Sequence, residues 1–522
     1  MHEQSSDLIL VNGKIILMDR KNTIAEAMAI KDGKIHVVGS SEEIKRLAGI
    51  HTKSIDLGGR VVMPGFIDCH THVDLVGMMN SDRVVNCRIP PLGSVGDILR
   101  NIGEKAEEIP KGELILGQSR WVQPLPTKKQ LDEVSPIHPV ILKNTMHSML
   151  LNSFALNKFG ITAKRPTVKE FIETGISGKI HRNVENGEPT GWIEDGWNYL
   201  FPNSHTPFSY DETKAFIKEG LNRYARVGVT TITELFTTPE SFKIYQELQE
   251  DNELNVRLHL VPCVHGVYKT VNLDSVLDLG IKTGFGNEWI KFGGVKIFLD
   301  SGTDTTLSSL ELKEIMKQTH RAGIRVFVHA TTRKSQDIAL EAIEAIVESM
   351  PEQDLRYRIE HMGNRLWDSN YFERMKKLKV IAVPTAYSIN IGLFYPEGLK
   401  MQVYRTMLDK GLCVPGNSDS AGAEPEAPNP FYQIWCMVER KLKDGTVKYP
   451  EEKVSVMEAL QMYTQHSAFA CHEEDIKGSI EPGKLADIVI LDQNPLTCST
   501  EELRNVRVDY TIVGGRVVYQ RV

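Results

Sequence analysis

The sequence of 522 residues is poor in features that would place the chain in a membrane or outside the cell. Its seven cysteines are scattered and include no Cys-x-x-Cys pair, which disfavours disulfide frameworks and cysteine-type zinc sites. No run of about 18 apolar residues occurs, so no membrane-spanning helix is expected. The first residues, MHEQSSDLIL, lack a basic segment followed by a long apolar one, so no secretory signal is expected. These absences predict a cytoplasmic protein with reduced thiols.

An excess of basic charge is also missing. The chain has 61 basic and 68 acidic residues, a formal net charge of −7, which argues against nucleic acid or an anionic membrane as a partner. With 41% hydrophobic and 25% charged residues, the composition is ordinary for a folded globular protein. The length allows one large barrel plus an extra domain, and it leaves a homodimer open.

Both ends of the chain carry the same local pattern, two apolar runs joined by a turn dipeptide. The dipeptides are Asn12-Gly13, Asp32-Gly33 and Gly514-Gly515. They favour two-residue hairpins, because type I′ turns need a positive φ at both central positions. We expect one small β-domain, a sandwich built from residues 1–60 and 470–522. The alternative is three unrelated hairpins.

Between the ends, short apolar runs alternate with segments of helical composition. The eight runs are Val61–Asp68, Gly228–Phe236, Val256–Val264, Gly294–Asp300, Ile324–Ala330, Arg356–His361, Lys379–Ala386 and Leu412–Asp419. Continuous apolar strands alternating with helices are typical of parallel sheets buried on both faces. We therefore predict an α/β fold with a (β/α)₈ barrel over residues 61–469. A doubly wound open sheet is the alternative, although no GxGxxG or P-loop motif supports it.

The spacing between the first two runs is too long for one βα unit. Residues 74–212 are therefore predicted to form an inserted subdomain on the first barrel loop. That loop opens at the C-terminal face of a barrel, where barrel active sites lie, so the insertion is a candidate lid or specificity wall.

Polar residues interrupt several of these apolar runs near their C-terminal ends. PGFIDCHTH places His70 and His72 two residues apart on a strand, so that both point to one side. The other interruptions are Lys296, His329, His361 and Asp419. Each alone is most simply a buried polar group with a partner, and for Lys296 this partner would be Asp300 or another carboxylate. Together they converge on one rim of the predicted barrel.

The convergent set suits a metal. Neutral imidazoles and a carboxylate are the usual ligands of Zn²⁺ and similar divalent ions. A lysine ammonium cannot bind a cation. A desolvated neutral lysine can react with CO₂, and the resulting carbamate offers two anionic oxygens that bridge two ions. The sequence thus predicts one or two divalent ions, with Lys296 carboxylated in the two-ion case.

The motifs PGFIDCHTH, VKIFLD, VFVHA, RIEH and NSD, in this order and spacing, resemble those of the amidohydrolase superfamily, specifically its YtcJ-like branch (amidohydrolase family 3). The tail GSIEPGKLADIVILDQNP fits the same resemblance, which covers essentially the whole chain. It implies a metal-dependent hydrolase in which a metal-activated hydroxide is the nucleophile. By this resemblance His70, His72 and Asp419 hold the more buried ion, and His329 and His361 hold the second.

The resemblance also implies roles for two of these residues. Carboxylated Lys296 would bridge the two ions. Asp419 would accept the proton of the nucleophile and pass it to the leaving nitrogen. A single ion with Lys296 unmodified remains the alternative.

The insertion departs from the family pattern. Its stretch NTMHSMLLNS has Thr145-Met146 where the family usually has Asp-Gly, while His147 is retained. His147 is a candidate catalytic residue that could reach the substrate or the transition-state oxyanion, and the alternative is a histidine packed within the insertion. Glu424 and Glu426 follow Asp419 in place of the usual short Trp-Pro and are expected to be solvated loop charges, with contact to a cationic group as the alternative. Glu194 is a further candidate for substrate binding, with a purely structural role as the alternative.

Aromatic residues gather near the predicted mouth of the site. They are Trp121, Trp192, Trp197, Phe236, Tyr387, Phe394 and Tyr395. If they face inward, they form a pocket for a small apolar or aromatic substrate, with Trp121 and Tyr387 as the leading contacts. The alternative is that most of them belong to the insertion's own core.

This reasoning favours hydrolysis of a C–N bond in an amide, N-acyl, N-formyl or cyclic amide compound. Two alternatives stay open. One is metal-dependent decarboxylation of an aromatic acid on the same scaffold, and the other is a non-catalytic scaffold protein. The sequence does not name the substrate, because loops set the function of a barrel.

Overall fold

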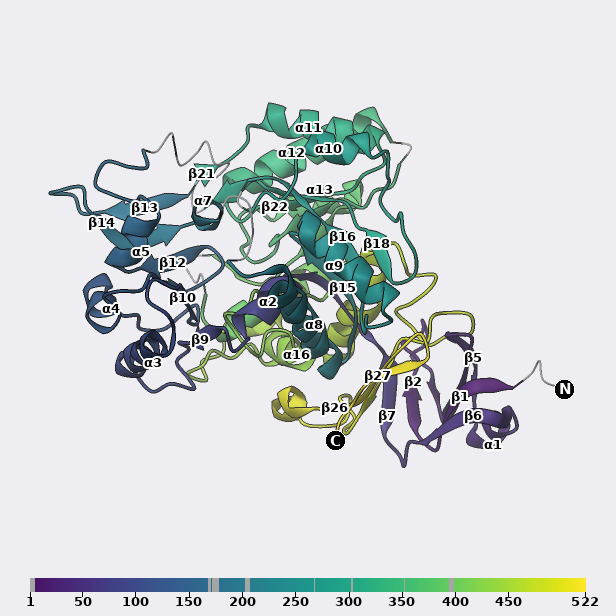
Figure 1. Ribbon diagram of the computed structural model, residues 1–522. Coiled ribbons are helices and arrows are strands. Elements are labelled where there is room, and N and C mark those ends of the chain that lie inside the picture. The colour runs from purple at the N-terminus through teal and green to yellow at the C-terminus, as the bar shows by residue number, and fades with distance from the viewer. Residues whose placement is uncertain are drawn as a thin grey trace.

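The architecture combines parallel and antiparallel sheets with surrounding helices (Figure 1). The computed structural model describes residues 5–167, 170, 178–201, 207–266, 268–301, 304–351, 353–393 and 399–522. None of the helices within these ranges is long and apolar enough to cross a membrane. The seven cysteines, all of which lie in these ranges, form no disulfide.

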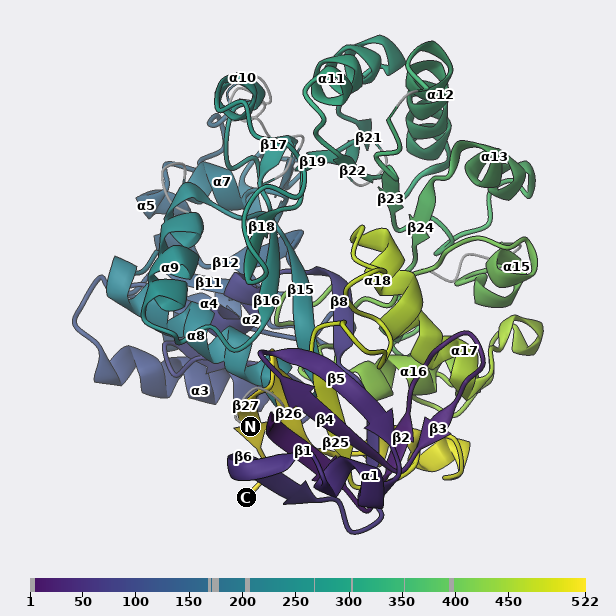
Figure 2. The same ribbon diagram turned by 90° about the vertical axis from the view of Figure 1, so that its right-hand side faces the viewer.

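Two neighbouring sheets on one side of the molecule are built from the two ends of the chain (Figure 2). One contains strands of the N-terminal part alone, and the other combines strands from both ends. Their strands are β1 (Ser6–Val11), β2 (Lys14–Ile16), β3 (Ile24–Ala25), β4 (Ala27–Lys31), β5 (Lys34–Gly39), β6 (Ala48–Asp56), β7 (Val61–Pro64), β25 (Ile488–Leu491), β26 (Val508–Val513) and β27 (Arg516–Gln520). One sheet has the order β5-β4-β1-β6 and the other β27-β26-β25-β7-β2-β3. Leu10 and Ile30 of the first sheet share a buried cluster with Ile15 and Ile490 of the second.

Two of the three predicted hairpins are confirmed. Residues 31 and 34 pair across Asp32-Gly33, and residues 513 and 516 pair across Gly514-Gly515. Both central residues have a positive φ in each case. The prediction of a hairpin at Asn12-Gly13 is wrong, because β1 and β2 lie in different sheets. Here the chain crosses between sheets at a close approach: a Cβ on Gly13 would lie 2.2 Å from Leu57 Cδ1.

The predicted α/β class is confirmed by two all-parallel sheets in the middle of the chain. Their strands are β8 (Phe66–Thr71), β15 (Val229–Leu235), β16 (Arg257–Val261), β17 (Cys263–His265), β18 (Ile290–Phe292), β19 (Val295–Phe298), β22 (Val326–His329), β23 (Arg358–Glu360) and β24 (Ile381–Val383). The orders are β18-β16-β15-β8 and β17-β19-β22-β23-β24. Most of their side chains are buried, which explains why the runs are continuously apolar.

Four of the eight runs differ from the expectation of one strand each. The first contains two strands, because the chain passes at Pro64-Gly65 from β7 to β8. The third is divided at Pro262, which has no N–H for a ladder, so that β16 and β17 belong to different sheets. The fourth, Gly294–Asp300, contains β19 and the first residue of β20 (Asp300–Ser301), which belong to different sheets. The last, Leu412–Asp419, contains no assigned strand. Its backbone nevertheless lies beside β8, since the N–H of Cys69 donates to Gly416 O at 3.1 Å.

Helices flank the parallel strands, as Figure 2 shows for the central part of the chain, except that α1 (Ser41–Lys45) packs against β1, β4 and β5 of the first terminal sheet. The other helices are α2 (Val73–Met79), α8 (Tyr210–Arg226), α9 (Pro239–Glu250), α10 (Leu273–Asp278), α11 (Ser309–Arg321), α12 (Arg333–Ser349), α13 (Asn370–Leu378), α14 (Tyr387–Asn390), α15 (Tyr404–Asp409), α16 (Pro430–Glu439), α17 (Val456–Gln461) and α18 (Ser467–Ala470). Short strands β20 (Asp300–Ser301) and β21 (Asp304–Thr305) and helical turns at Pro450–Glu452, Met462–His466 and Thr500–Asn505 complete them.

The predicted insertion contains a sheet of its own. Its elements are β9 (Val84–Asn86), α3 (Val95–Glu108), β10 (Ile115–Gln118), α4 (Lys128–Val134), β11 (Val140–Lys143), β12 (Ser148–Leu151), α5 (Ser153–Lys158), β13 (Lys179–Arg182), β14 (Pro189–Glu194) and α7 (Trp197–Leu200). The strand order is β13-β14-β12-β11-β10-β9. A separate buried cluster that includes Ile98, Leu131 and Leu142 joins α3 and α4 to this sheet.

A buried ion pair connects the parallel sheets to the terminal sheets. Arg257 of β16 donates to both carboxylate oxygens of Asp487, at 2.7 and 3.0 Å, and both side chains are buried. Asp487 also accepts from the backbone N–H of Gly514 at 2.8 Å. One carboxylate thereby fixes β16, β25 and the last hairpin relative to one another.

We expect Asp487→Ala to destabilise the fold by about 3–5 kcal/mol, because it leaves the buried Arg257 guanidinium without its counter-charge. The measurement is the midpoint of urea unfolding. Asp409→Ala is the matched control, because Asp409 pairs with Arg405 at the surface, where ion pairs contribute little. Equal midpoints for the two variants would contradict the prediction.

Candidate metal centre

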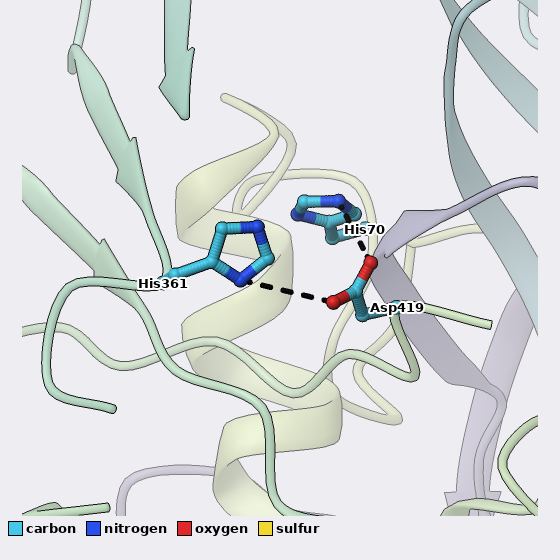
Figure 3. A group of neighbouring side chains, drawn as sticks. All are labelled: His70, His361 and Asp419. Carbon is cyan, nitrogen blue, oxygen red and sulfur yellow. Dashed lines mark ion pairs between the residues drawn. The ribbon is translucent and has the colours of Figure 1, made fainter. Parts of the chain in front are cut away.

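Three of the sequence-predicted residues form a compact group of possible ligands. The ligand atoms of His70, His361 and Asp419 lie within 4.8 Å of one another (Figure 3). His70 Nε2 is 3.3 Å from Asp419 Oδ1, and His361 Nδ1 is 3.7 Å from Asp419 Oδ2. His72 Nε2 is 3.6 Å from Asp419 Oδ1, so that it faces the same carboxylate.

Partners outside this group fix the orientation of His70, in β8, and of His72, directly after it. His70 Nδ1 lies 2.5 Å from Glu360 Oε2, and His72 Nδ1 lies 2.8 Å from Leu235 O. In each ring, Nε2 is therefore the nitrogen that remains available to bind a metal ion on the side of Asp419. Arg358 holds Glu360 through Nε and Nη2, at 2.8 and 2.9 Å. Such partners orient metal-binding imidazoles and raise their basicity.

Glu360 is a functional residue that the sequence reasoning missed. It lies directly before His361 and two residues after Arg358 in β23, so the alternation of the strand places the two charged side chains on one side. A buried Arg-x-Glu pair inside an apolar strand was the available signal. What it did not reveal is that Glu360 contacts His70, which comes from a distant strand.

His329 is held in the same way by Asp300. His329 Nε2 lies 3.2 Å from Asp300 Oδ1, and the His329 and His361 rings are 4.5 Å apart. Asp300 also accepts from the N–H groups of Thr331 and Thr332 at the start of α12, at 2.7 and 3.0 Å. The pairing of Asp300 with Lys296, the simple alternative for this lysine, is absent among the described residues.

Lys296 is fully buried, and among the described residues its Nζ has no hydrogen-bond partner. Burial lowers the pKa of Lys296 to about 8, although Glu360 and Asp419 oppose the shift. An isolated ammonium in such a place is costly, whereas a neutral amine or a carbamate bound to a metal is not. This orphaned amine fits the carbamate that the sequence predicts.

Electrostatics make the group suitable for a divalent ion. Burial lowers the pKa of His70 well below its usual range and that of His361 to about 3, so both rings are neutral. Burial raises the pKa of Asp419, but the histidines around it outweigh this, and the net shift is downward. Neutral imidazoles and an ionised carboxylate are the forms that bind Zn²⁺ and related ions.

A cavity of about 400 Å³ opens onto these groups. Its wall includes Trp121, Glu194 and Tyr387, the three predicted substrate contacts, together with Trp192 and His147. Two predicted aromatics do not line it: Trp197 packs over Lys143 Nζ at 4.2 Å, and Phe236 stacks on His72 at 4.2 Å. Phe394 and Tyr395 lie outside the described residues.

His147 faces this cavity from the turn between β11 and β12. Its Nδ1 lies 2.7 Å from Asp195 Oδ1. Burial alone lowers the pKa of His147, but Asp195, Asp419 and Asp300 outweigh it, so the pKa is raised. The neighbouring Glu194, a predicted site residue, instead pairs with His181 at 2.9 Å. Asp195 was not predicted, and nothing in the local sequence distinguishes it from Glu194.

The expectation of solvated charges after Asp419 is wrong for Glu424. Its carboxylate is buried and forms an ion pair with Arg120 Nη1, which comes from the insertion. Glu426 is half-exposed and lies 3.4 Å from the same nitrogen. The sequence around Glu424 could not reveal that Arg120 of the insertion is its partner. This ion pair attaches the insertion to the segment that carries Asp419.

Comparison with known proteins agrees with this geometry. The model of a family described as the amidohydrolase family matches residues 53–519. This chain belongs to the amidohydrolase family. An N-substituted formamide deformylase of Arthrobacter pascens is 28% identical over 99% of this chain and 99% of that protein. The YtcJ protein of Bacillus subtilis is 24% identical over 98% of each chain, which confirms the resemblance stated from the motifs.

Solved structures resemble this amidohydrolase-family chain in fold. An uncharacterized metal-dependent hydrolase from Pyrococcus horikoshii has a TM-score of 0.73 at 22% identity, covering 95% of this chain and 99% of that one. A counterpart from Pyrococcus furiosus has a TM-score of 0.70 at 24% identity, covering 94% and 100%. At these identities the likeness shows the fold alone.

We expect Glu360→Gln to weaken metal binding about 10–100-fold, because the neutral amide no longer fixes and polarises His70. Competition with a chelator measures the affinity. Glu452→Gln is the matched control, since Glu452 is a buried carboxylate that bonds Thr406. Metal affinities of the two variants that do not differ would refute the role given to Glu360.

Proposed function

We propose that the chain is a metal-dependent hydrolase that cleaves a C–N bond in an amide, N-acyl, N-formyl or cyclic amide compound. The observation that carries this proposal is the meeting of His70, His361 and Asp419 at the floor of a cavity beside an unpartnered buried lysine. Membership of the amidohydrolase family and the name of the Arthrobacter pascens relative support the same bond type.

We infer that the two parallel sheets and residues 412–419 form the wall of a (β/α)₈ barrel, and that the two terminal sheets form a β-sandwich. Support for the barrel comes from the order of the parallel strands and from the bonds between β8 and the last run. Support for the sandwich comes from the buried cluster that the terminal sheets share. Residues 74–212 are then an insertion on the first barrel loop.

The residues that would hold metal follow from the donor set. His70, His72 and Asp419 would hold one divalent ion, which we take to be zinc. His329 and His361 would hold a second, with carboxylated Lys296 between the two. Such ions lower the pKa of water toward neutrality and polarise a carbonyl.

The protein's own side chains would perform the remaining tasks. Asp419, whose carboxylate lies among three imidazoles, would take up a proton from the attacking water and return it to the leaving nitrogen. Trp121, Trp192 and Tyr387 would bind a small apolar or aromatic group, and Glu194 and His147 would contact polar atoms of the substrate.

We expect the purified, unchelated protein to contain one to two divalent ions per chain and to hydrolyse at least one member of a panel of amides, N-acyl compounds and N-substituted formamides. Elemental analysis and detection of the released amine and acid are the measurements. Release of CO₂ from an aromatic acid instead would indicate a decarboxylase. Full metal content without turnover of any compound would favour a non-catalytic scaffold.

Two variants should separate metal holding from proton transfer. We expect Lys296→Ala to lose one ion, whereas Asp419→Asn keeps much of its metal and loses at least about a hundredfold in kcat. Metal content and kcat are measured together across a metal titration, with the surface variant Asp409→Asn as control. If saturating metal fully restores the turnover of Asp419→Asn, then Asp419 is a ligand only.

A further inference from the structure

A chain of three side chains runs from the insertion to the parallel sheets at the edge of the cavity. His147 Nδ1 lies 2.7 Å from Asp195 Oδ1, and the Ser301 hydroxyl donates to Asp195 Oδ2. His147 lies in the turn before β12, Asp195 directly after β14, and Ser301 just after the strand that carries Lys296. Asp195 therefore joins a cavity histidine to the scaffold of the candidate metal centre.

The backbone reinforces the same pairing. The N–H of Asp195 donates to the carbonyl oxygen of His147 at 2.6 Å, and Tyr268 donates through its hydroxyl to the carbonyl of Met146. Asp195 has a φ of 49°, a left-handed conformation that costs free energy in a residue other than glycine. This conformation directs both the N–H and the carboxylate of Asp195 toward His147.

The geometry leaves one ring nitrogen of His147 for the cavity. Nδ1 is bound to Asp195, while among the described residues none hydrogen-bonds Nε2. The ring lies 6.1 Å from that of His329 and 6.3 Å from that of Phe298, and all three residues line the cavity. Asp195 is nearly fully buried, whereas 31% of the His147 side chain is exposed. The Asp195 carboxylate thus contacts the buried side of the His147 ring, away from the nitrogen that is left for the cavity.

A neighbouring pair provides an internal comparison. His181 and Glu194 are also a histidine and a carboxylate, 2.9 Å apart on β13 and β14. Both side chains are about one-third exposed or more, and His181 does not line the cavity. Of these two pairs, only that of His147 combines a buried carboxylate, an anchor from outside the insertion and a nitrogen left for the cavity.

We propose that His147 donates a hydrogen bond from Nε2 to the carbonyl oxygen of the scissile C–N group, and that Asp195, held by Ser301, is the residue that positions it. This inference rests on the proposed function. With Nδ1–H donated to Asp195, a protonated ring presents its second N–H to the cavity. A preorganised donor aimed at an oxygen that gains negative charge is worth roughly 10²–10³-fold in kcat.

The kinetic test uses the metal-loaded enzyme and N-benzylformamide, or whichever panel member is cleaved. We expect His147→Ala to lose about a hundredfold in kcat with little change in KM, and Asp195→Asn to lose at least about tenfold. The double variant should be no slower than His147→Ala alone, because the two residues act as one unit. Metal content should match that of the unaltered protein.

Glu108→Gln is the matched control, since it neutralises a surface carboxylate of the insertion that pairs with Lys105. An Asp195→Asn variant that turns over like Glu108→Gln would overturn the proposal. So would multiplicative losses in the double variant, or a loss confined to KM.

A second readout does not depend on turnover. In protein labelled with ¹⁵N-histidine, the NMR signal that His147→Ala removes should show a proton on Nδ1, and Asp195→Asn should shift or abolish that proton. If no panel member is cleaved, the proposed function fails, and this signal still decides whether Asp195 positions His147. An unchanged Nδ1 proton in Asp195→Asn would reject the positioning role.

Discussion

The candidate site depends on the hydrogen bonds that residues 69–72, at the end of β8 and directly after it, form with residues 416–420, at the end of the last apolar run. The N–H of Cys69 donates to Gly416 O, the N–H of Asp419 to His70 O, and the N–H of His72 to Ser420 O, at 2.7–3.1 Å. Donors and acceptors alternate between the two segments along His70 and His72. The bonds therefore fix the position of the Asp419 carboxylate along the strand relative to both rings. Without them, residues far apart in the sequence could not form this group of possible metal ligands.

Charged side chains surround the histidines of the candidate site and pair with them or with one another. Glu360 and Asp300 lie behind His70 and His329, and Arg358 lies behind Glu360. Each buried charge therefore has a partner of opposite sign or an imidazole, as low-dielectric surroundings require. Lys296 is the exception among these groups, and it is also the residue whose chemistry a metal would change most.

The sequence allowed the α/β class and the strand-end residues to be predicted, because each leaves a local pattern, whereas the six-stranded sheet within residues 74–212 was not predicted. Alternating apolar runs predict buried parallel strands, and a polar residue that ends such a run marks the rim. The Asn12-Gly13 turn, the partner of Glu424 and the contact of Glu360 with His70 could not be predicted in this way. All three depend on which distant segment approaches, and a single sequence carries no record of that approach.

The order of strands in the larger terminal sheet has a consequence for biosynthesis. Strand β7 pairs with β25, so that Val62 lies opposite Ile490, while β2 and β3 join the sheet only through β7. On the ribosome, the first strands emerge long before the partner that completes their sheet, and pairs so distant in sequence form slowly. The edge of β7 that pairs with β25 stays open until β25 has been synthesised. A prematurely terminated product would therefore expose an unpaired apolar strand edge, which is a feature that chaperones and proteases can distinguish from the finished protein.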